Sequence, residues 1–515
     1  MSHNLLPFKY KLEKKEKHIS GLAGLLIYLE LFMALRLREV IAQHLTVRSN
    51  GQGYSDDQII MALILLNLAG GESVSDIKHL SRDEGFCQIL KSMELKGAFG
   101  RNREKVKKRW SKILKGKDKV RNTIASPSSI FRYLAYFHNA EEEKRRIEGK
   151  SFIPHSNKYL GSFPYINYEL INFAQRRDPQ KRATLDHDAT IVETYKKEAL
   201  FCYKGPKSYL PFNVWWFEHE LLFYSEFRDG NVHPGFEQLR ILKECLVHLP
   251  LEVEEVFIRS DSAGYQYELL KYCAEGKNKR FGKIYFAICN DITPEFKRAI
   301  DWDEDVEWKP IYKELCNGRK IESGQEWAEV CYVPMELCRS KKSPDYRYIA
   351  IREELEQEVF PEMKDQLELP FPTMEMSQKR YKLTGLVTNL DWDGEKVIKW
   401  SRQRCGKSEE VHGIMKEDLA GGRFPSGDFG ENAAWWWIMI LALNIQSIMK
   451  KLVLGGKWKN KRMKLIRFRI INIPARISSY RDGLFEVRIT HNHPSFVVLN
   501  LARERIKKLA WLPSG

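Results

Sequence analysis

The sequence lacks the cysteine patterns that mark zinc-binding or disulfide-stabilised domains. Its 515 residues include nine cysteines, and no two of them form a Cys-x-x-Cys pair. This spacing excludes a zinc finger and a disulfide framework. It favours a reducing compartment, so we expect a cytoplasmic protein, which would be nucleoid-associated if its excess of basic residues binds DNA.

The sequence also has few long apolar runs. The polar, lysine-rich residues 1–17 do not resemble a signal peptide. The apolar stretch 19–35 carries Glu30, and the stretch 433–443 is much shorter than the roughly 20 residues a membrane span needs. We therefore expect two buried helices and no membrane partner.

Positive charge is in clear excess and is clustered. Lys and Arg number 84 against 68 Asp and Glu, which gives a net charge of +16. Residues 101–121 hold eleven basic and two acidic residues, and residues 451–515 hold fifteen and three. Phosphate contacts need many cations along one surface, so both regions are predicted to contact the DNA backbone. Apolar residues within them, such as Phe468, Ile470 and Ile471, are expected to anchor the second region to the protein body.

The first 150 residues are predicted to be helical. Ser55 begins a capping-box pattern before the apolar run 59–68, and glycines 70 and 71 end that helix. Ser73 repeats the capping pattern and starts another helix. Two short helices around a glycine turn resemble a helix-turn-helix, although any helical bundle has the same pattern.

After residue 183 the pattern predicts a mixed sheet covered by helices. Strands are expected at 183–193, 212–217, 221–227, 256–260, 284–289 and 383–390, with a helix at 236–249. Between 292 and 380 this rhythm is lost, which predicts a β-rich insertion beside the sheet. Towards the C-terminus, strands are expected at 465–473 and 484–490, followed by a basic helix at 494–509.

These patterns predict an α/β protein with five segments. They are a helical domain whose basic residues favour DNA binding (1–150), the first part of an α/β core (151–291), the β-rich insertion (292–380), the second part of the core (381–451) and a basic C-terminal region (452–515).

Acidic residues follow the predicted sheet strands. Asp186, Asp188 and Thr190 alternate along one strand and therefore share a face. Two carboxylates on one face repel each other unless a cation neutralises them, although a solvated edge strand has the same pattern. Asp261 follows the strand 256–260, where sheet proteins commonly bind ligands, and an ordinary helix cap is the alternative.

A late helix carries a third set of polar side chains. Glu409, His412 and Lys416 are spaced to share one helix face, and Ser408 can cap that helix. A carboxylate and an ammonium group two turns apart are suited to a metal ion and a phosphate. A solvated helix surface is the simpler alternative.

Together these segments resemble the DDE transposases of bacterial insertion sequences. Asp-x-Asp-x-Thr at 186–190, Asp-Ser-x-Gly-Tyr at 261–265 and Glu-(six residues)-Lys at 409–416 carry the resemblance. More narrowly, the chain resembles the insertion-sequence family numbered thirteen-eighty. The wider pattern has Tyr and Arg seven and four residues before the Glu, where this chain has Arg402 and Cys405, with Trp400 and Arg404 close by.

The resemblance implies an RNase H-like core that cleaves and transfers DNA strands. Asp188, Asp261 and Glu409 would hold two Mg²⁺ or Mn²⁺ ions, and Lys416 would contact phosphate. Asp186 is a supporting neighbour and Glu410 is the alternative third carboxylate. The implied partners are double-stranded DNA, as terminal inverted repeats and target, and a second copy in a homodimeric complex. An RNase H-like metal-dependent nuclease and a domesticated non-catalytic DNA-binding protein remain as alternatives.

Overall fold

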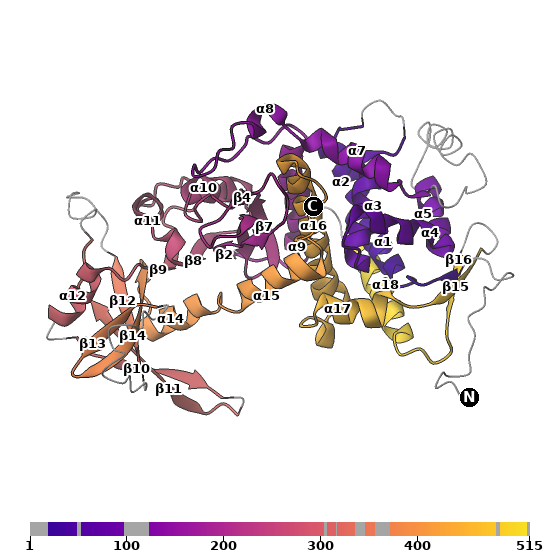
Figure 1. The fold of residues 1–515 in the computed structure, drawn as a ribbon. Coiled ribbons are helices and arrows are strands. Elements are labelled where there is room, and N and C mark those ends of the chain that lie inside the picture. The colour runs from indigo at the N-terminus through magenta and orange to yellow at the C-terminus, as the bar shows by residue number, and fades with distance from the viewer. Residues whose placement is uncertain are drawn as a thin grey trace, which may run out of the picture. The chain divides into compact units, whose positions relative to one another are not determined.

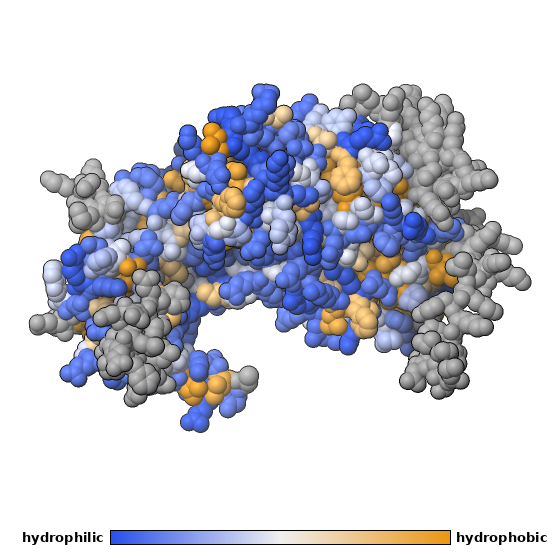
Figure 2. Space-filling view, viewed as in Figure 1, coloured by the Kyte–Doolittle hydropathy of each residue, from blue (hydrophilic) through white to orange (hydrophobic). Residues whose placement is uncertain are grey.

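The computed structural model describes residues 19–48, 53–96, 123–302, 306–315, 317–334, 346–355, 371–479 and 485–511. The chain forms two compact units, shown in Figure 1. Unit 1 comprises Met1–His138, Ser156–Ile166 and Glu417–Gly515. Unit 2 comprises Asn139–His155 and Asn167–Lys416. On the face drawn in Figure 2 the described surface is mostly hydrophilic, with hydrophobic side chains in scattered spots.

Unit 1 is mainly helical, as the sequence predicts for its N-terminal part. Its longer helices are α1 (Leu25–Ala34), α2 (Leu37–His44), α3 (Asp56–Ala69), α4 (Ile77–Arg82), α5 (Glu84–Lys96), α7 (Pro127–Leu134), α16 (Phe429–Ile448) and α18 (Phe496–Trp511). The predicted capping box at Ser55 is present, and Gly70 ends α3 with a φ of 96°. A three-stranded sheet in the order β1 (Ile19–Ser20), β15 (Ala475–Ser479), β16 (Phe485–Ile489) completes the unit.

Helix α16 is longer than the sequence analysis expects. The segment Phe429–Leu454 is long and apolar enough to cross a membrane, but 78% of its most apolar window is buried inside the protein. Trp435 and Trp436 are fully buried. The side chain of Gln446 accepts a hydrogen bond from the Tyr28 hydroxyl at 2.5 Å. These contacts are those of a core helix.

The C-terminal region joins this helical unit. Strand β15 pairs with β1, and α18 packs on α1, so residues from both ends of the chain share one fold. The predicted strand 465–473 is wrong, because α17 (Met463–Ile466) and a π-helical turn (Arg467–Ile471) occupy it. Ile466 and Ile470 are buried and four residues apart, which is helical spacing.

Unit 2 is built on a ten-stranded mixed sheet. Its order is β10-β11-β12-β14-β9-β8-β2-β6-β7, and β13 pairs with β14. The strands are β2 (Arg182–Ala189), β6 (Phe212–Trp216), β7 (Leu221–Glu226), β8 (Glu255–Ser260), β9 (Tyr285–Cys289), β10 (Lys309–Glu314), β11 (Lys320–Val330), β12 (Arg347–Glu354), β13 (Thr373–Met376) and β14 (Lys379–Thr388). Strands β2, β8 and β9 are parallel, and the others pair antiparallel. A smaller sheet holds β3 (Val192–Glu193), β4 (Leu200–Phe201) and β5 (Lys207–Tyr209).

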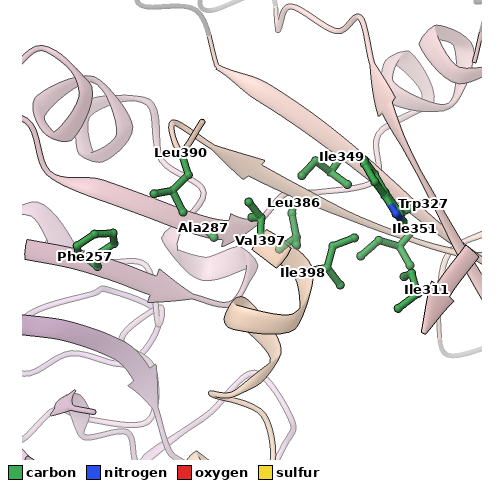
Figure 3. Close-up of a cluster of buried hydrophobic side chains, with 10 residues drawn as sticks. All are labelled: Phe257, Ala287, Ile311, Trp327, Ile349, Ile351, Leu386, Leu390, Val397 and Ile398. Atoms are coloured by element: carbon green, nitrogen blue, oxygen red, sulfur yellow. The ribbon is translucent and has the colours of Figure 1, made fainter. Parts of the chain in front are cut away.

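Helices cover both faces of this sheet, with α10 (Gln238–His248) and α11 (Tyr267–Ala274) on one side and α14 (Gly394–Arg402) on the other (Figure 1). Shorter helices are α8 (Ala140–Glu143), α12 (Pro294–Trp302) and α15 (Lys407–Gly413), and α9 (Phe163–Arg177) is divided between the units. Figure 3 shows Val397 and Ile398 of α14 directed into an apolar cluster on the sheet. Gly394 permits close packing there, because an added Cβ would lie 2.1 Å from the Trp327 ring.

The segment 292–380 has the expected β content but does not fold beside the central sheet. Strand β12 pairs with β14, and β14 pairs with β9, so these strands extend the same sheet. The predicted domain boundaries therefore differ from the structure, which groups residues 167–416 in one unit. Hydrogen bonding between strands, which no local pattern encodes, makes the difference.

Candidate active site

Two aspartates meet at the carboxyl ends of β2 and β8. The parallel register pairs Asp186 with Arg259 and His187 with Ser260. Asp188 and Asp261 are the next residues after His187 and Ser260, and their carboxylates are close enough for their charges to interact. The family resemblance implies that these two aspartates share one metal site with Glu409.

The charges around Asp188 are not balanced. Burial raises the pKa of Asp188 to about 6; the Arg404 guanidinium opposes this shift and the Asp261 charge adds to it. Arg404 Nη1 lies 3.1 Å from Asp188 Oδ2. One guanidinium thus faces two carboxylates, and the Asp188 side chain is still 19% exposed. Such a pair attracts a further cation, so the site fits a divalent metal ion.

Asp186 forms an ion pair with Arg259 that stabilises the fold. Arg259 Nε and Nη2 donate to its two carboxylate oxygens at 2.6 and 2.8 Å. Both side chains are almost fully buried, at 0% and 2% exposure. The sequence analysis did not identify Arg259 as the partner of Asp186. The equal spacing was a signal, because Arg259 precedes Asp261 by two residues and Asp186 precedes Asp188 by two residues. The pair leaves Asp188 as the accessible carboxylate of this strand.

The start of α15 lies beside the aspartates. A hydrogen bond from Ser408 is among the causes that lower the pKa of Asp188. Glu409, the next residue, is exposed and makes no hydrogen bond or ion pair within the described residues. Glu410 is also exposed and lies 3.7 Å from Lys407 Nζ. The structure therefore brings the helix to the aspartates and leaves the Glu409 carboxylate in solvent.

Lys416 lies at the same end of β2. Its Nζ donates to the backbone oxygen of Ile191 at 3.3 Å, two residues after the β2 terminus. It stands in a π-helical turn, Ile414–Asp418, so the helical register changes between Glu409 and Lys416. His412 contacts Asn213 of β6 at 3.3 Å, and burial lowers the pKa of His412 to about 4. His412 is therefore neutral at pH 7.

The basic regions are described only in part. Residues 101–121 lie outside the described residues. In residues 451–511 the apolar anchors Ile470 and Ile471 are buried as predicted, whereas Phe468 is 77% exposed and anchors nothing. Two further arginines are structural. Arg467 donates to backbone oxygens of α3, and Arg505 donates to those of Val453 and Leu454.

The fold and this site are typical of an enzyme that acts on phosphate esters. A mixed sheet that presents paired carboxylates at parallel strand ends, with a lysine and an acidic helix beside them, suits cation-assisted chemistry on a phosphate substrate. The family model described as transposase DDE domain group 1 matches residues 8–511, and the chain belongs to this family.

Similarity to other known proteins is low. No curated protein matches the chain. Among solved structures, it is similar to a cryo-EM structure of a piggyBac transposase synaptic complex with hairpin DNA. That match has a TM-score of 0.35 and 10% identity, and it covers 96% of this chain and 82% of the other.

The chain is therefore a DNA transposase, an enzyme that cleaves DNA strands and transfers them. DDE transposases in general depend on divalent metal ions.

Proposed function

We propose that this transposase acts at the ends of an insertion sequence of the family numbered thirteen-eighty. Its RNase H-like core would use Asp188, Asp261 and Glu409 as metal ligands. The observation that carries this proposal is the register of β2 and β8, which sets Asp188 beside Asp261. The position of β2 between antiparallel β6 and parallel β8 supports the assignment of the core.

The residues present suit Mg²⁺ or Mn²⁺. Hard divalent cations prefer carboxylate oxygens, which Asp188 and Asp261 provide, whereas the thiols of Cys289 and Cys405 nearby suit softer metals. The imidazole of His412 contacts Asn213 through its Nε2. Two bound ions would activate the attacking oxygen and stabilise the leaving oxygen at phosphorus. Asp188, which interacts with both Asp261 and Ser408, would be the ligand that the two ions share.

Arg404 and Lys416 supply positive charge to the same place. Arg404 neutralises part of the Asp188 charge and holds its carboxylate in a fixed orientation. Among the described residues, Lys416 has one hydrogen bond, of 3.3 Å to the backbone after β2, so its ammonium group could turn to a phosphate near the scissile bond. Glu409 would have to move toward the aspartates to join them as a ligand, because its side chain is exposed in this structure.

The test is cleavage of duplex DNA built from the sequence that flanks the gene, with and without Mg²⁺. We expect metal-dependent nicking at the inverted repeats and joining of the cut ends to target DNA. Cut ends that stay unjoined would indicate a nuclease. Intact DNA that is nevertheless bound would indicate a non-catalytic DNA-binding protein.

The exposed cations of unit 1 are proposed to hold the DNA backbone. Lys457, Lys459, Lys461 and Arg462 are exposed over a short stretch of chain. Replacing the three lysines with alanine should weaken binding to every duplex and reduce the slope of log affinity against log salt by about 0.9 per lost contact. An unchanged slope would show that these side chains are a solvated surface. We further propose a homodimer in the DNA complex.

A further inference from the structure

A second cavity lies at the opposite end of the strands that carry the aspartates. It has a volume of about 600 Å³ and is lined in part by Arg182, Trp392, Lys396, Lys399 and Trp400. These five residues are called the aromatic cleft. Arg182 begins β2, six residues before Asp188, so at about 3.3 Å per residue this wall of the cleft lies roughly 20 Å from the acidic site. At the other wall the lining includes Gln403, the neighbour of Arg404, which pairs with Asp188. The cleft therefore runs from the start of β2 toward the acidic site.

The walls of the aromatic cleft are aromatic rings. Trp392 and Trp400 pack edge to face with centroids 5.6 Å apart, and Phe257 lies 6.0 and 5.7 Å from them. Phe257 is buried in the core, as Figure 3 shows, whereas both tryptophans remain partly exposed. The tryptophans thus present ring surface to a ligand while the core holds them in place.

Cations border these rings. The Arg182 guanidinium stands 4.2 Å from the Phe257 centroid, and Lys396 Nζ stands 4.4 Å from the Trp392 centroid. The two acids in the lining are engaged within the protein, and Arg182 is also paired, with Glu255 at 3.1 Å. Asp393 caps α14, and Glu395 pairs with Lys399 at 2.7 Å and accepts the Tyr312 amide. The lining carries three basic and two acidic side chains.

The combination of exposed aromatic rings and basic side chains indicates which class of ligand the cleft binds. A cationic ligand is disfavoured, because lysine and arginine already stand over the rings and the surplus charge is positive. A purely apolar peptide would remove the charged side chains of the lining, such as Lys396 beside Trp392, from water. Unpaired nucleotides match both features, since their bases stack on aromatic rings and their phosphates attract cations.

We propose that the aromatic cleft binds unpaired nucleotides of a DNA strand. The inference rests on the proposed function in one respect, namely that strand cleavage produces unpaired DNA near the enzyme. The cleft would hold that strand beside the acidic site, because Gln403 of its lining is the neighbour of Arg404. Arg259 joins the two places, because it pairs with Asp186 of β2 and its Nη1 donates to the Trp400 oxygen at 2.7 Å.

The experiment measures binding of a labelled single-stranded oligothymidylate to the full chain in EDTA, so that no cleavage occurs. Stacking is worth enough per base that Trp392→Ala should weaken this binding roughly 5- to 150-fold, while Trp392→Phe retains most of it. Trp302→Ala is the matched control, because Trp302 lies on α12 and is 80% exposed. It should leave the affinity unchanged. Duplex affinity should change in neither variant.

Equal single-strand affinity of Trp392→Ala and the unmodified chain overturns the proposal, as does an equal loss for the duplex. Photocrosslinking with 5-iodouracil in the oligonucleotide decides the case even if Trp392→Ala does not fold. A cross-link within residues 392–403 supports the cleft, and one elsewhere refutes it. If the chain binds single strands in the cleft but cuts no DNA, the inference is supported and the proposed function is contradicted. If it cuts DNA but does not bind single strands in the cleft, the proposed function is supported and the inference is contradicted.

Discussion

The two ends of β2 and β8 differ in chemistry although they belong to the same strands. At the carboxyl ends, Asp188 and Asp261 leave negative charge only partly compensated by Arg404. At the opposite ends, Arg182 and Phe257 contribute a cation and an aromatic ring. Between them, Asp186 and Arg259 form a buried ion pair in which each charge neutralises the other. A charged side chain that is fully paired inside the sheet therefore stabilises the fold, and one that is only partly paired can bind a ligand.

The largest effect is expected at the acidic end. Asp188→Ala should reduce metal-dependent DNA cleavage by at least about a thousand-fold, the loss typical of a group that stabilises the transition state. DNA affinity should remain nearly unchanged. Asp301→Ala, at an exposed position of α12, is the control and should cleave normally. If Asp188→Ala cleaved and a folded Asp186→Ala did not, the register of the site would be wrong by two residues.

The next effect tests the pair between the two ends. Arg259→Met leaves the Asp186 carboxylate buried without its partner, which should lower the free energy of unfolding by about 3–5 kcal/mol. Urea denaturation followed by circular dichroism measures it. The exposed pair of Arg298 and Glu295 is the control, and its removal should cost less than about 1 kcal/mol. Equal costs for the two pairs would contradict a structural role of Arg259.

A smaller effect is expected where α14 meets the sheet. Gly394→Ala sets a methyl group 2.1 Å from the Trp327 ring, and overpacking of this kind costs about 1–3 kcal/mol. Gly413→Ala in α15 meets no atom within 4 Å and should be neutral or slightly stabilising. Thermal melting of both variants distinguishes them. A neutral Gly394→Ala would mean that α14 does not pack as described.

The smallest effect concerns thiol reactivity on the two sides of the sheet. Cys405 is exposed near the acidic end, whereas burial raises the pKa of the Cys273 thiol in α11. The thiolate is the reactive form, and a raised pKa lowers its population at pH 8. Iodoacetamide should label Cys405 and leave Cys273 unmodified until the chain is unfolded, as mass spectrometry can show. Rapid labelling of Cys273 in the native protein would contradict the packing of α11.

Much of the architecture follows from the sequence. Alternation predicts β2 and the β6–β7 hairpin, and the strand before Asp261 and the helix of Glu409 are found where expected. Short apolar runs are less informative, because a strand and a buried helix both satisfy them, and residues 465–473 were assigned to the wrong class for this reason. The extent of the sheet was also missed, since β12 reaches β14 through long-range hydrogen bonds.

The sequence by itself determined that two carboxylates would share a strand face and that a third acid would stand on a late helix, because residue periodicity sets those directions. It could not decide which aspartate remains accessible. Arg259 is 73 residues from Asp186 along the chain, and only the parallel register of β2 and β8 brings them together. The same register places Asp188 one step further, beside Asp261. Tertiary structure made that choice because Arg259 holds both oxygens of the buried Asp186 carboxylate, whereas Asp188 has a single contact with Arg404 and stays 19% exposed.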